Sequence, residues 1–187
     1  LDVCTGTAEL AMTASRHRPA PRAVLGVDFA GAMLALGHEK LRSAGLSPIV
    51  RLVRGDACRL PCPSETIDAV TVGFGIRNVE DTTRAVEEMF RVLKPGGRLA
   101  ILEFGEPRVP VLRSLYLWYF QRVLPLIGRR VSRHTEAYAY LPASVSAFLT
   151  PDALVGLLRA SGFSGVCVDR LTCGVVYLYV GQKPNGA

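Results

Sequence analysis

Residues 1–10, LDVCTGTAEL, are followed at residues 24–29 by VLGVDF, and these two stretches decide the fold. The first is typical of a buried strand that turns through small residues into a helix. The second is typical of another strand, with Asp28 at its tip. Backbone N–H groups at a helix start favour an anionic group, here a carboxylate. An acidic side chain roughly 20 residues further on can accept both hydroxyls of a ribose. The pair therefore predicts a pocket for a nucleoside cofactor.

The rest of the chain alternates between strand-like and helix-like segments. Apolar, β-branched runs at 49–57, 67–75 and 98–105 carry hydrophobic residues on both faces, as strands covered on two sides by helices do. Segments 31–43 and 80–93 have apolar residues at helical spacing, and we expect them to be crossover helices. The pattern predicts an α/β fold with a mostly parallel sheet.

Two glycine-containing stretches predict turns. Residues 95–97, Pro-Gly-Gly, are expected to end the second crossover helix and to form a turn before the strand at 98–105. Residues 165–183 contain two strand-like halves around Thr-Cys-Gly at 172–174, which predicts an antiparallel hairpin at the edge of the sheet.

The composition indicates one globular domain over residues 1–187, because 49% of its residues are hydrophobic. Only residues 1–3 belong to a first strand that normally has about five residues, so we expect that the domain lacks its N-terminal part. The net charge of +6 favours anionic partners. The five cysteines lack metal-site spacing, which predicts reduced thiols and no metal. No apolar run reaches the roughly 18 residues of a spanning helix, and no secretory pattern opens the chain, so a cytoplasmic location is expected.

Residues 109–133, VPVLRSLYLWYFQRVLPLIGRRVSR, break the alternation with a mixture of aromatic residues and five arginines. A surface helix with aromatic residues on one face and arginines on the other would rest among the anionic headgroups of a membrane, as a peripheral protein. Alternatively, the segment packs on the same subunit or across a homodimer. The composition alone leaves both alternatives open.

Acidic and small residues follow the ends of the predicted strands. Asp28 either accepts the ribose hydroxyls or caps the helix that starts near Gly31, and these two roles are compatible. Asp56 and Ala57 follow the third strand, at the edge where ligands of open α/β sheets collect. The carboxylate of Asp56 suits the amino group of an adenine, although a solvated loop acid is the alternative interpretation.

The fourth strand runs into Gly73-Phe74-Gly75-Ile76-Arg77-Asn78. Two glycines that flank an aromatic residue let the backbone approach a ligand closely. Arg77 and Asn78 then supply a cation and an amide at the edge of the sheet. This stretch is therefore a candidate for the chemistry of the site.

Six blocks, in this order, carry a resemblance to a known family: LDVCTGTAEL, VLGVDFAGAML, GDACRLPCP, FGIRNVED, MFRVLKPGGRLAILEF and YAYLPASV. They resemble the class I S-adenosylmethionine-dependent methyltransferases of the ubiquinone/menaquinone biosynthesis C-methyltransferase family. The chain departs from that pattern at Thr5 and Ala8, where the family usually has glycines, and at Gly73, where it often has serine.

The resemblance implies a Rossmann-like, seven-stranded sheet and methylation of a prenylated quinol precursor, either demethylmenaquinol or a ubiquinol precursor, with S-adenosylmethionine as cofactor. It places Asp28 on the ribose and the following residues around the rest of the cofactor: Asp2, Gly6 and Thr7 near the methionine part, Asp56 and Ala57 at the adenine, and Gly73 in the pocket wall.

The same resemblance puts Arg77 and Asn78 near the reacting end of the cofactor. Loss of a phenolic proton makes the adjacent ring carbon nucleophilic, and a cation stabilises that phenolate more strongly in a dry pocket than in water. We therefore expect Arg77 to stabilise the phenolate and Asn78 to orient the ring oxygen, with Tyr138 as a further candidate. The base is unassigned: the alternatives are His134 and a water held by Arg77 or Glu103.

Other functions share parts of this pattern. A nicotinamide-dependent dehydrogenase has the same strand, turn and distal acid, but Asp2, Asp56 and the Pro-Gly-Gly corner argue against it. A methyltransferase for another lipid or small molecule and an inactive scaffold of a quinone-synthesis complex stay open. Methylation of RNA is not favoured, and no nucleic-acid partner is expected, because we identify no aromatic stacking platform beside a basic groove.

Overall fold

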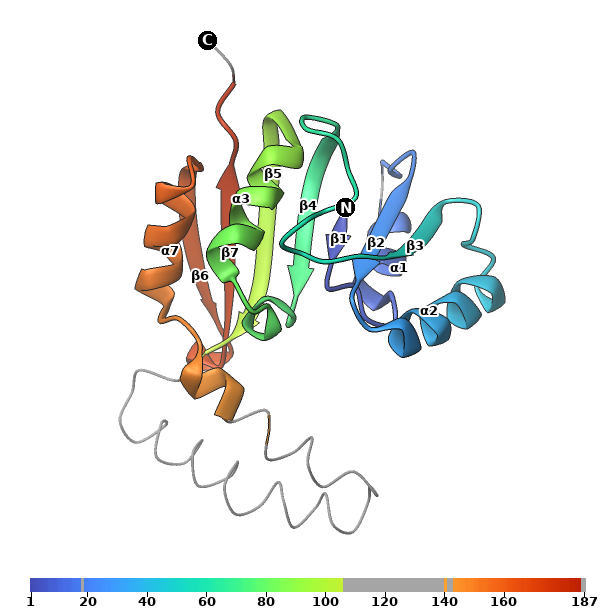
Figure 1. Ribbon diagram of the computed structural model, residues 1–187, viewed down its shortest axis with the longest axis horizontal. Coiled ribbons are helices and arrows are strands. Elements are labelled where there is room, and N and C mark those ends of the chain that lie inside the picture. Colours follow the sequence, from blue (N-terminus) through green and yellow to red (C-terminus); the bar gives the residue numbers. More distant parts are fainter. Residues whose placement is uncertain (18, 106–139, 141–142, 186–187) are drawn as a thin grey trace.

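The computed structural model describes residues 1–17, 19–105, 140 and 143–185 of the chain. The insertion at 109–133, His134 and Tyr138 lie outside these residues. The described strands form one seven-stranded sheet in the order β3-β2-β1-β4-β5-β7-β6 (Figure 1). Its strands are β1 (Asp2–Val3), β2 (Val24–Asp28), β3 (Val50–Arg54), β4 (Ile67–Gly73), β5 (Leu93–Phe104), β6 (Ser164–Leu171) and β7 (Val176–Gln182).

The first five strands pair in parallel, and β7 runs antiparallel to both of its neighbours, β5 and β6. These pairings confirm the predicted α/β fold, with a mostly parallel sheet and a C-terminal antiparallel hairpin. The chain builds outward from β1 to β2 and β3, and then returns to the other side of β1 with β4. The strand order therefore reverses between β1 and β4, which is where open α/β sheets bind ligands.

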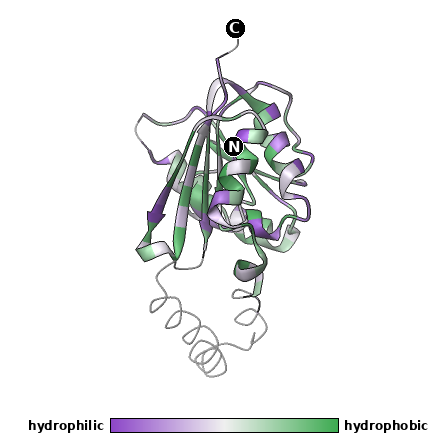
Figure 2. Ribbon diagram, turned by 90° about the vertical axis from the view of Figure 1, so that its left-hand side faces the viewer, coloured by the Kyte–Doolittle hydropathy of each residue, from purple (hydrophilic) through white to green (hydrophobic). Residues whose placement is uncertain are grey.

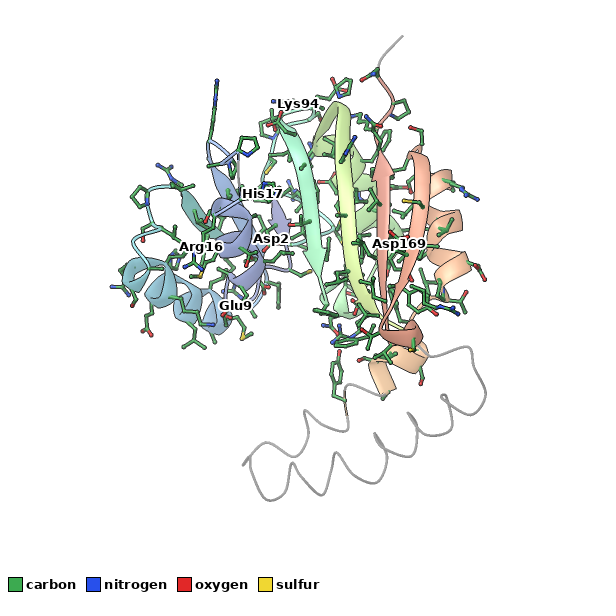
Figure 3. All side chains as sticks on the ribbon, turned by 180° about the vertical axis from the view of Figure 1, so that it is seen from behind. Asp2, Glu9, Arg16, His17, Lys94 and Asp169 are labelled. Carbon is green, nitrogen blue, oxygen red and sulfur yellow. The ribbon has the colours of Figure 1, made fainter. Side chains whose placement is uncertain are left out.

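Helices cover the sheet in two groups. The labelled α-helices are α1 (Glu9–Ser15), α2 (Gly31–Ser43), α3 (Thr82–Val92) and α7 (Pro151–Ala160), residues 143–147 are also helical, and the short 3-10 helices are η1 (Ile76–Asn78) and η3 (Thr172–Gly174). In Figure 1, α3 lies in front of β5 and β7 and α7 lies in front of β6, whereas Figure 3, seen from behind, has α1 in front of the sheet. Hydrophobic residues concentrate in the sheet between these helices (Figure 2).

Each group of helices packs on its own hydrophobic cluster. Leu34 and Leu41 of α2 pack with Val50 and Leu52 of β3 in one cluster. Met89 of α3 belongs to the other and larger cluster, which extends across β4, β5 and β7. Burial of each of these side chains contributes roughly 1.5–3 kcal/mol to the stability of the fold and holds the helices against the strands. The ends of β1 to β4 are thereby held at one edge.

The prediction of a separate turn at the Pro-Gly-Gly stretch is wrong. Instead of forming a separate turn before the strand, residues 95–97 lie inside β5, which starts at Leu93 directly after α3. The pairing of β4 with β5 is irregular there, because Ile67 pairs with Leu93 whereas Ala69 pairs with Arg98. Gly96 takes a φ of +78°, which a residue with a side chain rarely adopts. The predicted turn is therefore an irregularity within a longer strand.

An ion pair between the buried Glu88 and the partly exposed Arg91 holds the connection between β3 and β4 against α3. Glu88 is 4% exposed and accepts the backbone N–H of Leu60 at 2.9 Å. Arg91 donates to the Glu88 carboxylate at 2.7 and 2.8 Å and to the carbonyl of Cys62 at 3.0 Å. The hydrogen bonds from Arg91 hold the pKa of Glu88 below its ordinary value. The connection that carries Asp56 and Ala57 is thereby fixed to the core.

We expect Glu88→Ala to lower the free energy of unfolding by about 2 kcal/mol, because it leaves the N–H of Leu60 and the guanidinium of Arg91 without their partner. Urea unfolding at neutral pH measures this change. Glu87→Ala is the matched control: its side chain is 50% exposed, and its removal should cost less than about 1 kcal/mol.

The lowered pKa of Glu88 also predicts a pH dependence. Its stabilising contribution is complete above the ordinary glutamate pKa and is lost as the pH falls through the lowered pKa of the folded state. Glu88→Gln should therefore reduce the loss of stability on acidification. An acid unfolding series in which Glu88→Gln follows the wild-type curve would contradict this assignment.

Candidate functional site

A cavity of about 880 Å³ lies at the carboxyl ends of β1, β2, β3 and β4, where the strand order reverses. Five of the predicted cofactor residues line it, and they come from four different connections: Gly6, Asp28, Asp56, Ala57 and Gly73. The sheet topology thus brings together residues that are up to 67 positions apart in the sequence. A cavity of this size at this edge is suited to a ligand the size of a nucleoside.

The turn after β1 has an unusual backbone. Cys4, Gly6 and Ala8 all have positive φ angles, of 57°, 56° and 69°. A Cβ atom at Gly6 would meet only the Met33 methyl group, at 3.8 Å, so glycine is favoured there by conformation and not by lack of space. The N–H of Gly6 donates to Asp28 at 2.7 Å. This N–H therefore serves the protein itself and not the anionic ligand group expected from the sequence.

Asp28 is the anchor of this edge. One carboxylate oxygen accepts the N–H of Gly6 at 2.7 Å, and the other accepts the N–H of Ala30 at 2.8 Å. An ionised carboxylate has about four acceptor positions, so each oxygen keeps capacity for one more hydrogen bond. The two interpretations of Asp28 are compatible in this geometry, because it holds the start of α2 and can still accept two hydroxyl groups.

An exposed aromatic ring lies next to Asp28. Phe29 lines the cavity and is 73% exposed, which is unusual for a phenylalanine. The guanidinium of Arg54 lies 5.6 Å from the centre of the ring, and its Nε donates to the carbonyl of Phe29 at 3.1 Å. A ring held in this way offers a flat surface to a purine. Phe29 is not among the residues predicted from the sequence, although an aromatic residue directly after the acid is a signal for this role.

Asp56 also lines this cavity. Its Oδ1 accepts the N–H of Cys58 at 2.8 Å, which fixes the orientation of the carboxylate. The second oxygen is suited to accept an N–H from a ligand such as the amino group of an adenine. Ala57 is buried and lines the cavity beside it, and its small side chain leaves room for a ring.

Two cysteines line the cavity but are not nucleophiles. Burial raises the pKa of Cys4 to about 12, and burial also raises the pKa of Cys58. A thiol with a raised pKa stays protonated near neutral pH, whereas the thiolate is the reactive form. Covalent catalysis by these cysteines is therefore not supported. The part of the chain that the structure describes also contains no cluster of three metal-ligating side chains.

Asp2 and Thr7 support the cavity from behind instead of lining it. The carboxylate of Asp2 is 2% exposed and accepts the hydroxyls of Thr5 at 2.6 Å and Thr71 at 2.8 Å, which ties the turn to β4. Burial raises the pKa of Asp2. The hydroxyl of Thr7 accepts the ammonium of Lys40 on α2 at 2.8 Å. These two side chains hold the shape of the turn.

Arg77 and Asn78 differ in where they lie. Asn78 lines the cavity, but Arg77 does not. The Arg77 side chain is 9% exposed, and its Nη1 pairs at 2.7 Å with Glu103, whose side chain is fully buried. Nη1 also donates to the carbonyl of Phe74, a cavity residue with a φ of 56°. The guanidinium lies 5.4 Å from the ring centre of Phe104. Its charge is thus compensated, and it holds the wall of the cavity from outside.

The described lining of the cavity is acidic, in contrast to the chain as a whole. Four carboxylates line it, from Asp28, Asp56, Glu80 and Asp81, against one guanidinium, from Arg84. The chain carries a net charge of +6, which had suggested anionic partners. Because carboxylates stabilise nearby positive charge, the cavity favours a cationic ligand. A sulfonium compound meets this requirement.

Comparisons with known proteins agree with this geometry. The profile of the ubiE/COQ5 methyltransferase family matches residues 1–183. A demethylmenaquinone methyltransferase of Thermus thermophilus is 45% identical over 184 residues, which cover 98% of this chain and 82% of that protein. A ubiquinone/menaquinone biosynthesis C-methyltransferase of Geobacter sulfurreducens is 40% identical over 183 residues, 98% of this chain and 71% of that protein.

Solved structures share the fold at low sequence identity. A phosphoethanolamine N-methyltransferase of Haemonchus contortus, in complex with S-adenosyl-L-methionine, superimposes with a TM-score of 0.72 at 16% identity, over 98% of this chain and 48% of that one. The [4+2]-cyclase SpnF gives a TM-score of 0.75 at 19% identity, over 99% and 74%. Because one of these proteins is a cyclase, structural likeness at this level shows the fold alone.

Asp28→Ala should weaken the binding of S-adenosylhomocysteine about 100-fold, because it removes two hydrogen bonds to a charged acceptor and also releases the turn at Gly6. Isothermal titration calorimetry measures the affinity, and NAD in the same cell tests the dehydrogenase alternative. Asp68→Ala is the matched control, since Asp68 is 85% exposed at the opposite end of β4. Equal affinities for wild type and Asp28→Ala would show that this carboxylate does not hold the ligand.

Proposed function

The chain belongs to the ubiE/COQ5 methyltransferase family, and we propose that it transfers the methyl group of S-adenosylmethionine to a ring carbon of demethylmenaquinol or of a prenylated ubiquinol precursor. Family membership makes it an S-adenosylmethionine-dependent C-methyltransferase of quinone biosynthesis. The observation that carries the substrate proposal is the match to demethylmenaquinone methyltransferases over nearly the whole chain. The acidic cavity at the reversal of strand order independently supports a sulfonium cofactor.

The lining residues fit the cofactor group by group. We assign the ribose hydroxyls to Asp28, whose oxygens keep acceptor capacity, and the adenine to Asp56 and Ala57 with Phe29 beside them. Gly6 and Gly73 then line the region of the methionine part. Asp2 and Thr7 act on the cofactor through the shape of the turn.

S-adenosylmethionine supplies a methyl group that its cationic sulfur has already made electrophilic. The task of the chain is therefore to align the acceptor, to exclude water and to stabilise the phenolate form of the acceptor ring. We assign the contact with the ring oxygen to Asn78, because its amide lines the cavity. A hydrogen bond to a developing phenolate is worth more in a dry cavity than in water.

We assign Arg77 to positioning, because it reaches the cavity only through other residues. Its bonds to Phe74 and Glu103 hold η1 against the end of β5, and Asn78 is the last residue of η1. Glu103 is engaged in this pair and is not suited to hold a water as the base. Tyr138 and His134 are the other candidates for acceptor chemistry. Both lie outside the described residues, and their roles stay predictions from the sequence.

The proposed partners of the chain are a prenylated acceptor and a membrane surface. None of the described helices is long and apolar enough to cross a membrane. A prenylated acceptor would be reached from the bilayer surface, which is the role we propose for the basic aromatic segment at 109–133. A homodimer is the alternative use of that segment. Another lipid or small molecule is the second candidate acceptor.

The test is transfer of a labelled methyl group from S-adenosylmethionine by the full-length protein to demethylmenaquinol and, separately, to a demethylated ubiquinol precursor. We expect turnover with one of these quinols. Arg77→Ala should lose about 100-fold in turnover, the size expected when a group that stabilises developing charge is misplaced.

Binding of S-adenosylhomocysteine is the control for folding, and its affinity should fall by less than about tenfold in Arg77→Ala, because Arg77 supports the cavity wall at Phe74 but does not itself line the cavity. Turnover at the wild-type rate in this variant would remove Arg77 from the mechanism. Absence of label from both quinols would contradict the proposed substrate class.

A further inference from the structure

Two described residues that follow the insertion, Tyr140 and Ser144, form side-chain hydrogen bonds with η1. The hydroxyl of Tyr140 donates to Oδ1 of Asn78 at 2.9 Å. The Nε of Arg77 donates to the hydroxyl of Ser144 at 3.3 Å, and residues 143–147 are helical. In Figure 1 this short helix lies beside the ends of β5 and β7, on the same side of the molecule as η1. Arg77 and Asn78, the two residues predicted to act on the acceptor, are thus each hydrogen-bonded to a residue more than 60 positions later in the chain.

In the structure, the bond from Tyr140 engages the oxygen end of the Asn78 amide and leaves the donor end available. An amide side chain has one accepting oxygen and two N–H donors. The oxygen is engaged by the Tyr140 hydroxyl, and among the described residues no hydrogen bond from Nδ2 of Asn78 is seen. Because Asn78 lines the cavity, the group it can offer to a ligand is the N–H donor.

This orientation matters for a ring oxygen that gains negative charge. An N–H donor stabilises a phenolate, whereas an amide oxygen in the same place repels it. Without the Tyr140 hydroxyl, the amide can turn by half a rotation and present its oxygen. Stabilisation that strengthens as charge develops raises the rate more than it tightens substrate binding.

We propose that Tyr140 is a positioning residue for methyl transfer: its hydroxyl fixes the Asn78 amide so that Nδ2 donates to the acceptor oxygen as this oxygen becomes a phenolate. The inference rests on the proposed function, because it requires a phenolic acceptor. Tyr140 is 56% exposed, so its role does not come from packing in the core. Tyr140→Phe removes only the hydroxyl and keeps the ring.

The experiment measures kcat for the quinol as a function of pH in wild type and Tyr140→Phe. We expect kcat near neutral pH to fall about tenfold, the worth of one hydrogen bond, and the profile to move about one pH unit upward, since the acceptor then ionises less readily. The rate of Tyr140→Phe should recover at alkaline pH. Its affinity for S-adenosylhomocysteine should equal that of wild type.

Ser144→Ala is the matched control, because it removes the other hydrogen bond of the same segment but leaves Tyr140 and Asn78 in place. This variant should leave the pH dependence of kcat where it is in wild type. In the Asn78→Ala background, Tyr140→Phe should cause no further loss of kcat, because Tyr140 acts on the acceptor only through Asn78.

A loss that is uniform across pH, an equal shift of the profile in Ser144→Ala, or additive losses in the double variant would each overturn the role of Tyr140. A different result would contradict the proposed function. If wild type methylates neither quinol, the substrate class is wrong and this inference falls with it, whereas a Tyr140→Phe enzyme indistinguishable from an active wild type overturns this inference alone.

Discussion

The carboxylate of Asp28 is the interaction on which the site depends. It accepts the N–H groups of Gly6 and Ala30, and so joins the turn after β1 to the start of α2. The turn needs this support because three of its residues have positive φ angles, two of which are not glycine. Asp2 adds a second support, through its bonds to Thr5 and Thr71. The cavity exists because these two acids keep an unfavourable backbone in one conformation.

Charge is distributed in opposite ways over the chain and over the cavity. The net charge of +6 comes mostly from arginines, many of them on the insertion at 109–133 or on exposed surfaces. The cavity lining is acidic instead, and Arg77, the cation expected to face the acceptor, is paired with Glu103 behind the wall. The lining thereby suits a sulfonium cation, and in the proposed mechanism the stabilisation of the acceptor rests on the neutral donor of Asn78.

Periodicity and turn residues predict the architecture well, because burial on two faces and glycine at positive φ leave local traces in the sequence. The helix at 31–43 and the hairpin around 172–174 are confirmed, and five of the seven residues assigned to the cofactor line one cavity. Side-chain direction is harder to predict. Spacing brings Thr7 and Arg77 to the correct edge, but Lys40 and Glu103, more than 20 positions away, turn them from the cavity. The bond from Tyr140 to Asn78 spans 62 positions and has no local signal.

We propose that four strand ends surround one adenosyl ligand whose sulfur points toward Asn78. The decisive measurement is a crystal structure of the protein with S-adenosylhomocysteine. Both ribose hydroxyls should lie within hydrogen-bond distance of Asp28, the adenine between Phe29 and Ala57 with its amino group near Asp56, and the sulfur on the side of Asn78. A ligand bound at another edge of the sheet, or one that leaves Asp28 without contact to the ribose, would rule out this cofactor site.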